Sequence, residues 1–199
     1  IGSSELLNFS GIETLLFVGK GAAAADLNAN GSTTDFGENS YSLRLDDNFM
    51  SRNGTLVDGV TRIYVRNDND LANDVDVTKG VVGSANNGLT IDATLLSASN
   101  AFEYNGQEGA GATADRFIVA DAIVNGRTII DGGASGNSAA GNADVLEVRQ
   151  TAAGLGAQVT ADDLANIKNV STLEFVNRGA SDVNHFLELT NDVVENLVN

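Results

Sequence analysis

Hydrophobic residues along the chain fall into short alternating runs, separated by polar turns rich in Asn, Asp and Gly. Successive side chains of a β-strand face opposite sides, so a short alternating run predicts a half-buried strand. Long stretches with helical spacing are scarce, and we therefore predict an all-β fold. The runs that predict strands are Leu43–Leu45, Arg62–Arg66, Val75–Thr78, Leu89–Ala93, Asp115–Val119, Arg127–Ile130 and Val145–Arg149.

A few short segments have the spacing of a helix instead. They are Ala22–Leu27, Ala161–Ile167 and Asn191–Leu197. Asp162 and Asp163 stand where acidic residues favour the first turn of a helix. These segments are too short to dominate the fold, so we expect one β-rich module over residues 1–199. A weak subdivision near residues 83–88 is the alternative.

A repeat links the two ends of the chain. Residues 6–21 and 164–179 align without a gap, and seven of the sixteen aligned positions are identical. Each copy has the pattern of a corner, a strand and a Gly/Asn turn, which is typical of one rung of a solenoid. We expect a parallel β-solenoid, β-roll-like, or else a β-sandwich, with short helical corners. Related units at both ends would expose strand edges to neighbouring copies or modules.

The composition and net charge exclude several kinds of chemical site and disfavour several kinds of ligand. The chain has no Cys, which excludes disulfides, zinc–thiolate sites and thiol nucleophiles. It has 27 acidic and 11 basic residues and a net charge of −16, which disfavours binding to nucleic acid or anionic lipid. Bound Ca²⁺ would neutralise clustered carboxylates. The alternative is that the acidity only keeps the surface soluble.

The length of the hydrophobic runs and the identity of the first residue lead to two further expectations. None approaches the roughly 20 residues of a membrane-spanning helix, so we expect no membrane insertion. The chain begins with Ile1 rather than Met, and we expect it to be an excerpt of a larger protein.

One polar segment, residues 26–38, opens like a calcium-binding loop. Its oxygen-bearing side chains alternate before a glycine that permits a sharp reversal. An EF-hand requires a carboxylate at the twelfth position, where this chain has glycine, and amphipathic helices do not flank the segment. We therefore expect an irregular calcium loop, with an Asn- and Asp-rich surface turn as the alternative. The expected ligands are Asp26, Asn28, Asn30, Asp35 and Glu38.

A second segment combines TIIDGGASGN at residues 128–137 with DVLEV at residues 144–148. Together they resemble the hemolysin-type calcium repeats of the RTX family, whose units read roughly GGxGxDxLx. The resemblance implies that stacked turns share Ca²⁺, with Asp131, Asn137 and Asp144 as ligands. The motif occurs once, and residues 138–143 interrupt it, so a glycine-rich turn without metal is the alternative.

The same resemblance implies a function. RTX repeats occur in bacterial surface proteins that are secreted by type I systems. The resemblance therefore implies an extracellular structural protein that uses Ca²⁺ and self-assembles into an S-layer, filament or matrix. Its partners would be copies of itself or neighbouring modules of the same surface protein. The first alternative is an adhesin that binds a glycan or a surface protein.

Catalytic side chains are few. His185 is the only histidine, and no Cys accompanies it. Carboxylate pairs are plentiful, so the second alternative is an extracellular polysaccharide-active enzyme. Sugar clefts of such enzymes are usually lined by Trp and Tyr, and this chain has no Trp and three Tyr. We therefore expect that the protein is not an enzyme.

Overall fold

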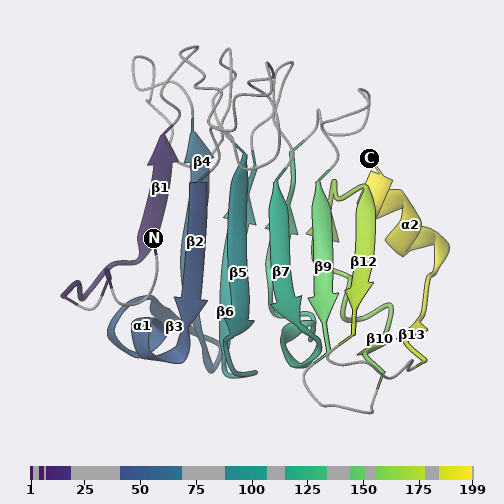
Figure 1. Ribbon diagram of the computed structural model, residues 1–199, viewed down its shortest axis with the longest axis horizontal. Helices are drawn as coiled ribbons and strands as arrows, with labels where there is room; N and C mark the ends of the chain where they lie inside the picture. Colours follow the sequence, from purple (N-terminus) through teal and green to yellow (C-terminus); the bar gives the residue numbers. More distant parts are fainter. Residues whose placement is uncertain are drawn as a thin grey trace.

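The computed structural model describes residues 1, 5–6, 8–18, 41–68, 88–106, 115–133, 144–150, 156–177 and 184–198. The described part consists mostly of strands with few helices (Figure 1). The strands are β1 (Thr14–Val18), β2 (Tyr41–Asp46), β3 (Thr55–Val57), β4 (Val60–Asp68), β5 (Leu89–Leu95), β6 (Asn100–Asn105), β7 (Arg116–Ala120), β8 (Ile129–Asp131), β9 (Val145–Arg149), β10 (Gln158–Val159), β11 (Ile167–Lys168), β12 (Thr172–Val176) and β13 (Phe186–Leu187). The helices are α1 (Asp47–Arg52), α2 (Asn191–Val198) and the short 3₁₀ helix η1 (Asp121–Ile123).

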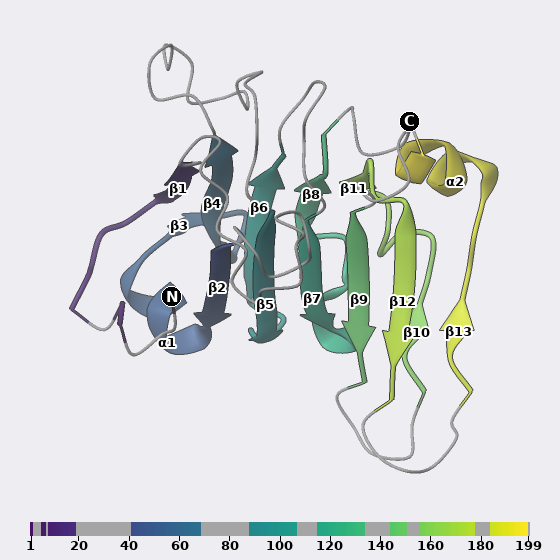
Figure 2. The ribbon, with the colours of Figure 1, turned by 45° about the horizontal axis from the view of Figure 1, so that its top comes forward.

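Most successive strands alternate between two sheets of parallel strands, and the exception is β3, which pairs antiparallel with β4 in sheet A. Sheet A has the order β1-β4-β6-β8-β11, and sheet B has the order β2-β5-β7-β9-β12. The strands of sheet B lie side by side in Figure 1, with sheet A behind them. The short strands β10 and β13 form a separate parallel pair beside β12 (Figure 2). This strand-rich, parallel arrangement with few helices fits the predicted all-β class.

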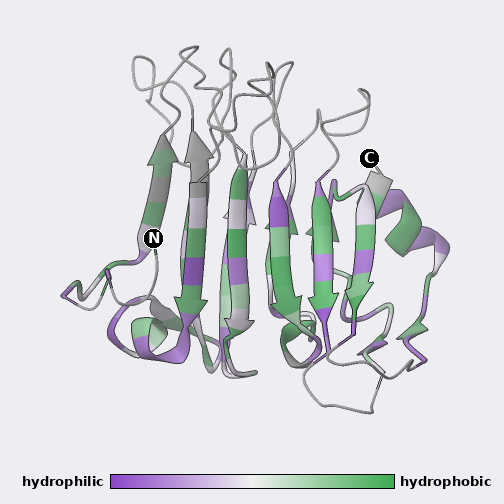
Figure 3. Cartoon of the chain, in the orientation of Figure 1, coloured by the Kyte–Doolittle hydropathy of each residue, from purple (hydrophilic) through white to green (hydrophobic). Residues whose placement is uncertain are grey.

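The core lies between the two sheets. Strands of sheet B alternate hydrophobic and polar residues, as β5 and β9 show in Figure 3. Their register aligns Ile91, Phe117 and Leu146 on adjacent strands, and all three are fully buried. The Phe117 ring lies 4.8 Å from the ring of Tyr104 on sheet A, measured between centroids. Each such buried side chain contributes about 1.5–3 kcal/mol, so the stacked rows hold the two sheets together.

A helix cap, a side-chain hydrogen bond and a hairpin turn hold the N-terminal end of the stack together. Helix α1 begins after Asp46, whose carboxylate accepts the Phe49 N–H at 2.8 Å. The buried side chain of Asn53 accepts the Ile12 N–H at 2.9 Å and so ties the N-terminal segment to the end of α1. Between β3 and β4, Asp58 and Gly59 both have positive φ, as a tight hairpin turn requires.

At the C-terminal end, α2 packs on the last strand of sheet A. The Asn169 N–H, just after β11, donates to the Asn196 carbonyl at 3.0 Å. Val193 on α2 is buried in the core. The edge strand of sheet B at this end is β12, whose residues are half-buried or exposed.

The structure confirms most of the predicted strands. Runs at 43–45, 62–66 and 89–93 lie inside strands, and Val145–Arg149 is β9 itself. The runs at 115–119 and 127–130 are each shifted by one or more residues. The strand predicted at 75–78, the helix predicted at 22–27 and nearly all of the boundary predicted at 83–88 lie outside the described residues.

Two helix predictions fall on described residues. The prediction at 191–197 is confirmed by α2. The helix predicted at 161–167 is wrong: these residues form tight turns with hydrogen bonds between residues three apart, such as Leu164 N–H to the Ala161 carbonyl at 3.2 Å. Ile167 is then drawn into β11, because its pairing with Ile130 on β8 extends sheet A.

The repeat corresponds to two strands in different places. Residues 14–18 form β1, at one edge of sheet A, and residues 172–176 form β12, at the opposite edge of sheet B. Both copies are therefore edge strands, at opposite ends of the molecule (Figure 1).

Candidate cation site and the polar face of sheet B

Only two of the predicted calcium ligands fall within the described residues. Asp131 ends β8 in sheet A, and Asp144 immediately precedes β9 in sheet B. The ligands that lie outside the described residues are Asp26, Asn28, Asn30, Asp35, Glu38 and Asn137.

Asp144 and Asp115 form a row of buried carboxylates at the amino ends of adjacent strands of sheet B. The Asp144 Oδ1 accepts the Asp115 N–H at 2.7 Å, and the Asp115 Oδ1 accepts the Leu89 N–H, also at 2.7 Å. Both aspartates are almost fully buried, with 2% and 3% exposure for Asp144 and Asp115. Each carboxylate thus caps the strand of the preceding rung.

The second oxygen of each carboxylate has a different environment. The Asp115 Oδ2 accepts a short hydrogen bond from the Tyr104 hydroxyl. The Asp144 Oδ2 is buried and has no hydrogen-bond partner in the described part of the chain. It lies against Gly132, which leaves room because it has no side chain. An orphaned buried carboxylate oxygen is costly unless a proton or a cation satisfies it.

Asp131 lies close enough to act on Asp144 electrostatically. Its Oδ1 accepts hydrogen bonds from the Gly133 N–H at 3.2 Å and from the Asn169 side-chain amide at 2.6 Å. Burial, together with the negative charges of Asp115 and Asp131, raises the pKa of Asp144 to about 8, although the hydrogen bond from the Asp115 N–H acts in the opposite direction.

These residues meet some of the requirements of a calcium site. The donors are hard oxygens, and the orphaned Asp144 oxygen is a free ligand position. Within the described residues, however, three or more His, Cys, Asp or Glu side chains do not gather closely enough to hold a metal ion. Asp131 and Asp144 would therefore need main-chain carbonyls or further side chains to complete the coordination.

The sequence analysis missed Asp115 and Tyr104 as parts of this cluster. A signal existed for Asp115: the segments DRFIV and DVLEV both place Asp directly before a strand, at positions that pair one strand apart. Tyr104 gave no comparable signal, because it comes from the other sheet and reaches Asp115 only across the core.

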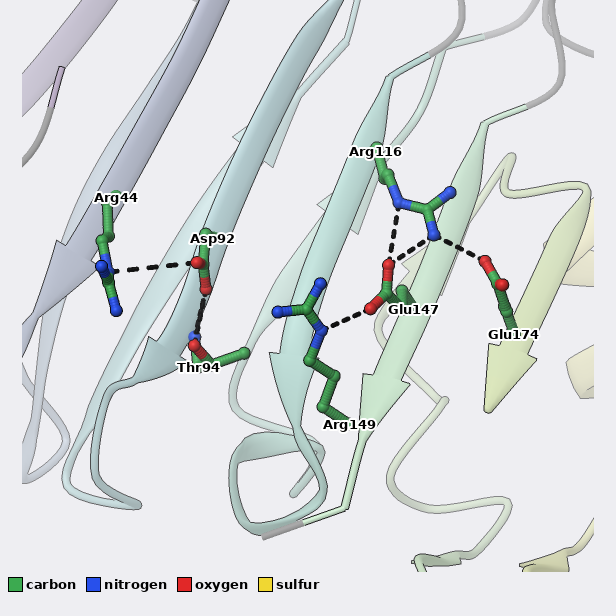
Figure 4. Close-up of polar contacts among 7 residues, drawn as sticks. All are labelled: Arg44, Asp92, Thr94, Arg116, Glu147, Arg149 and Glu174. Carbon is green, nitrogen blue, oxygen red and sulfur yellow. Dashed lines mark hydrogen bonds and ion pairs between the residues drawn. The ribbon is translucent and has the colours of Figure 1, made fainter. Parts of the chain in front are cut away.

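The outer face of sheet B carries a network of ion pairs (Figure 4). Glu147 is 3% exposed although it faces outward, because two arginines cover it. Arg116 donates to Glu147 through Nε at 2.9 Å and to Glu174 through Nη2 at 2.6 Å. Arg149 donates to the other Glu147 oxygen through Nε. Burial alone would raise the pKa of Glu147, but the hydrogen bonds from Arg149 and Arg116 outweigh burial and lower it.

Replacing Glu147 with Gln should destabilise the fold by roughly 1–3 kcal/mol, because two charged hydrogen bonds at a buried position are weakened. The measurement is urea unfolding at neutral pH. Glu174→Gln is the matched control, because Glu174 binds the same Arg116 but is 45% exposed, and its loss should cost less than about 1 kcal/mol. If Glu147→Gln and Glu174→Gln reduced the free energy of unfolding equally, burial of Glu147 would not be what makes its hydrogen bonds important.

A cleft of about 460 Å³ lies at the carboxyl ends of four sheet B strands, next to this network. The residues that line it are Thr94, Leu95, Ala120, Arg149, Gln150, Val176 and Asn177. These seven residues include one arginine and no carboxylate.

His185 is held by structural contacts. Its Nδ1 accepts the Ala157 N–H at 3.0 Å, so its Nε2 carries the hydrogen and donates to the Asn177 side-chain carbonyl. The imidazole ring also lies 5.1 Å from the Phe175 ring. These contacts join the β13 segment to the segments that precede β10 and follow β12.

The chain matches no protein-family model, no curated protein and no solved structure. The helices of the described part are all too short or too polar to cross a membrane.

Proposed function

We propose that the chain is a parallel β-solenoid that serves as a structural, non-enzymatic module of an extracellular bacterial surface assembly. The alternation of successive strands between sheets A and B supports a solenoid, because each pair of strands then forms one rung. Such a stack grows by adding rungs at its ends, so a second copy or a neighbouring module is the natural partner.

The observation that carries this proposal is the location of exposed hydrophobic side chains. Among the described residues, all but one of the large exposed hydrophobic side chains lie near the two ends of the stack. Ile1 hydrogen-bonds to the outer edge of β2, Phe9 contacts the end of α1, and Leu56 is in β3. The exposed hydrophobic side chains at the C-terminal end of the stack are Phe186, Leu189 and Val194, which lie on or beside β13 and α2. The one exposed hydrophobic side chain away from both ends is Leu95.

The C-terminal end is also hollowed. A groove of about 140 Å³ lies between α2, β12 and β13, and hydrophobic side chains dominate its lining. Leu173, Leu189 and Val194 are among them. Because hydrophobic side chains at exposed edges favour association, this end supports contact with a neighbouring copy or module.

Calcium is part of the proposal. The buried oxygen of Asp144 and the neighbouring Asp131 carboxylate supply two candidate ligands between adjacent rungs. Extracellular calcium modules bind with dissociation constants of about 10⁻⁴–10⁻³ M, so their sites fill outside the cell. A cation bound only by the folded chain would couple export to folding.

In about 1 mM calcium the purified chain should form polymers, and excess EGTA should disperse them and lower the melting temperature. Leu189→Asp should abolish the polymers without changing the circular dichroism spectrum, because Leu189 is 50% exposed at the C-terminal end. The measurements are light scattering and circular dichroism.

Leu95→Asp is the matched control. Leu95 is 48% exposed but lies at the end of β5, an inner strand of sheet B, so this variant should polymerise like the wild type. Polymers that survive both chelation and Leu189→Asp would overturn the proposal. A chain that stays monomeric in calcium would favour the adhesin alternative.

A further inference from the structure

The cleft at the carboxyl ends of the sheet B strands extends over several strands, which suits a chain-like ligand. Its residues come from the ends of β5, β7, β9 and β12, four adjacent strands of sheet B. Because neighbouring strands are about 4.8 Å apart, the cleft runs roughly 14 Å across the sheet. A linear molecule that lies perpendicular to the strands would contact all four.

Arg149 gives the cleft its charge. Its Nε is bound to Glu147, and this contact fixes the plane of the guanidinium group. The two terminal nitrogens make no hydrogen bond with the other residues drawn in Figure 4 and have no partner among the described residues. A guanidinium edge held in place by a buried carboxylate is a ready donor for a ligand carboxylate. Arg149 is the one charged side chain among the seven residues that line the cleft, and Glu147 occupies only its Nε edge.

The other polar groups around the cleft favour a ligand with hydroxyl groups. Asn177 accepts from His185 through its carbonyl, which leaves its amide N–H groups as donors. Thr94 donates its hydroxyl hydrogen to Asp92 at 2.6 Å, which leaves its oxygen lone pairs as acceptors. Ala120 at the end of β7 and Val176 at the end of β12 add hydrophobic side chains to the lining.

We propose that this cleft binds an acidic polysaccharide, with Arg149 pairing with a uronate carboxylate. The sugar hydroxyls accept from Asn177 and donate to Thr94, and the C–H faces of the rings lie on Ala120 and Val176. A saccharide fits this alternation of hydrophobic and hydrogen-bonding positions better than an acidic peptide, whose side chains carry few hydroxyl groups. The inference does not depend on self-assembly or on the calcium ligands.

Titration calorimetry with a galacturonic acid hexamer tests the site, in buffer that contains about 1 mM calcium. The wild type should bind the hexamer, and a neutral hexamer of glucose should not bind. Arg149→Met should weaken binding at least about tenfold, because a charged hydrogen-bonded pair is lost. Arg44→Met is the matched control, because Arg44 lies on the same face of sheet B outside the cleft. It should bind like the wild type.

Leu95 supplies a second test that leaves the Glu147 network intact. Leu95→Asp adds a negative charge to the cleft and should weaken binding of the hexamer, whereas Leu95→Asn should have a much smaller effect. Equal binding by wild type, Arg149→Met and Leu95→Asp would overturn the inference, and so would equal binding of oligoglutamate. Because Leu95→Asp should still polymerise and Leu189→Asp should still bind the hexamer, failure of this site and failure of the proposed assembly are distinguishable.

Discussion

Asp144→Asn is expected to make the calcium-free protein more stable at about pH 8, although it removes a candidate metal ligand. Asn retains an oxygen that can accept the Asp115 N–H, and it replaces the orphaned Oδ2 with a neutral amide group. In the wild type, a carboxylate at this buried position beside Asp115 and Asp131 must either hold a proton or carry an unpaired charge. Removal of that charge should stabilise the fold.

The pH dependence follows from the direction of the shift. The pKa of Asp144 is about 8 in the folded chain, whereas an unfolded Asp has a pKa of about 3.9. Between these values the folded protein holds a proton that the unfolded chain has released. The contribution to stability is therefore full below about pH 4 and is lost as the pH rises through about 8. The loss is on the order of a few kcal/mol.

Urea unfolding in EGTA at about pH 5 and about pH 8 measures this effect. The wild type should lose stability between the two conditions, and Asp144→Asn should lose much less. Asp162→Asn, which changes an exposed acid, should behave like the wild type. Addition of calcium should stabilise the wild type more than Asp144→Asn, if Asp144 binds the cation. A wild type whose stability is the same at both pH values would show that Asp144 is ionised without cost.

Gly132→Ala should destabilise the fold by several kcal/mol and weaken any calcium binding at Asp144. A Cβ atom on Gly132 would lie well under 3.0 Å from the Asn169 carbonyl oxygen and from the Asp144 Oδ2. The first of these atoms belongs to the backbone and the second to a buried carboxylate, so neither can move freely. Overpacking of this kind usually costs about 1–3 kcal/mol, and a backbone clash costs more.

Gly59→Ala is the control for this substitution. Gly59 has a positive φ of 77°, and a Cβ there would meet nothing within 4 Å. Gly59→Ala should therefore lower the free energy of unfolding by only about 1 kcal/mol, because alanine disfavours a positive φ. Thermal unfolding of both variants separates steric clash from backbone strain, and a Gly132→Ala variant as stable as Gly59→Ala would show that adjacent turns do not pack as closely as the structure indicates.

The strands of sheet B were the most predictable part of the fold. Leu43, Ile91 and Leu146 alternate with polar neighbours because one side of each strand faces the core and the other faces solvent. This alternation depends only on neighbouring residues, so the sequence alone is enough to predict it. Strand β6 (Asn100–Asn105) was missed, since Ala101 and Phe102 are both buried and break the alternation. Helix α1 was missed because its six residues contain only two buried side chains, Phe49 and Met50.

The candidate cation site was predictable only in part. The glycines and Asp131 form a recognisable turn pattern, and Asp144 stands before a strand. The contacts that decide its chemistry, with Asp115 and Tyr104, join residues on adjacent rungs and on opposite sheets. Sequence spacing does not reveal such contacts, because the lengths of the turns between strands vary along the chain.

The sequence by itself determined that this chain forms short strands, lacks thiol chemistry and carries a strongly acidic surface, since these properties depend on composition and on neighbouring residues. The tertiary structure alone decided that the two copies of the repeat became edge strands of different sheets. It alone decided that one carboxylate oxygen of Asp144 was left buried without a partner in the described part of the chain, and that Arg149 lines a cleft at the carboxyl ends of sheet B. The physical reason is that strand pairing in parallel sheets joins residues more than 25 positions apart, as the pairing of Thr90 with Arg116 shows.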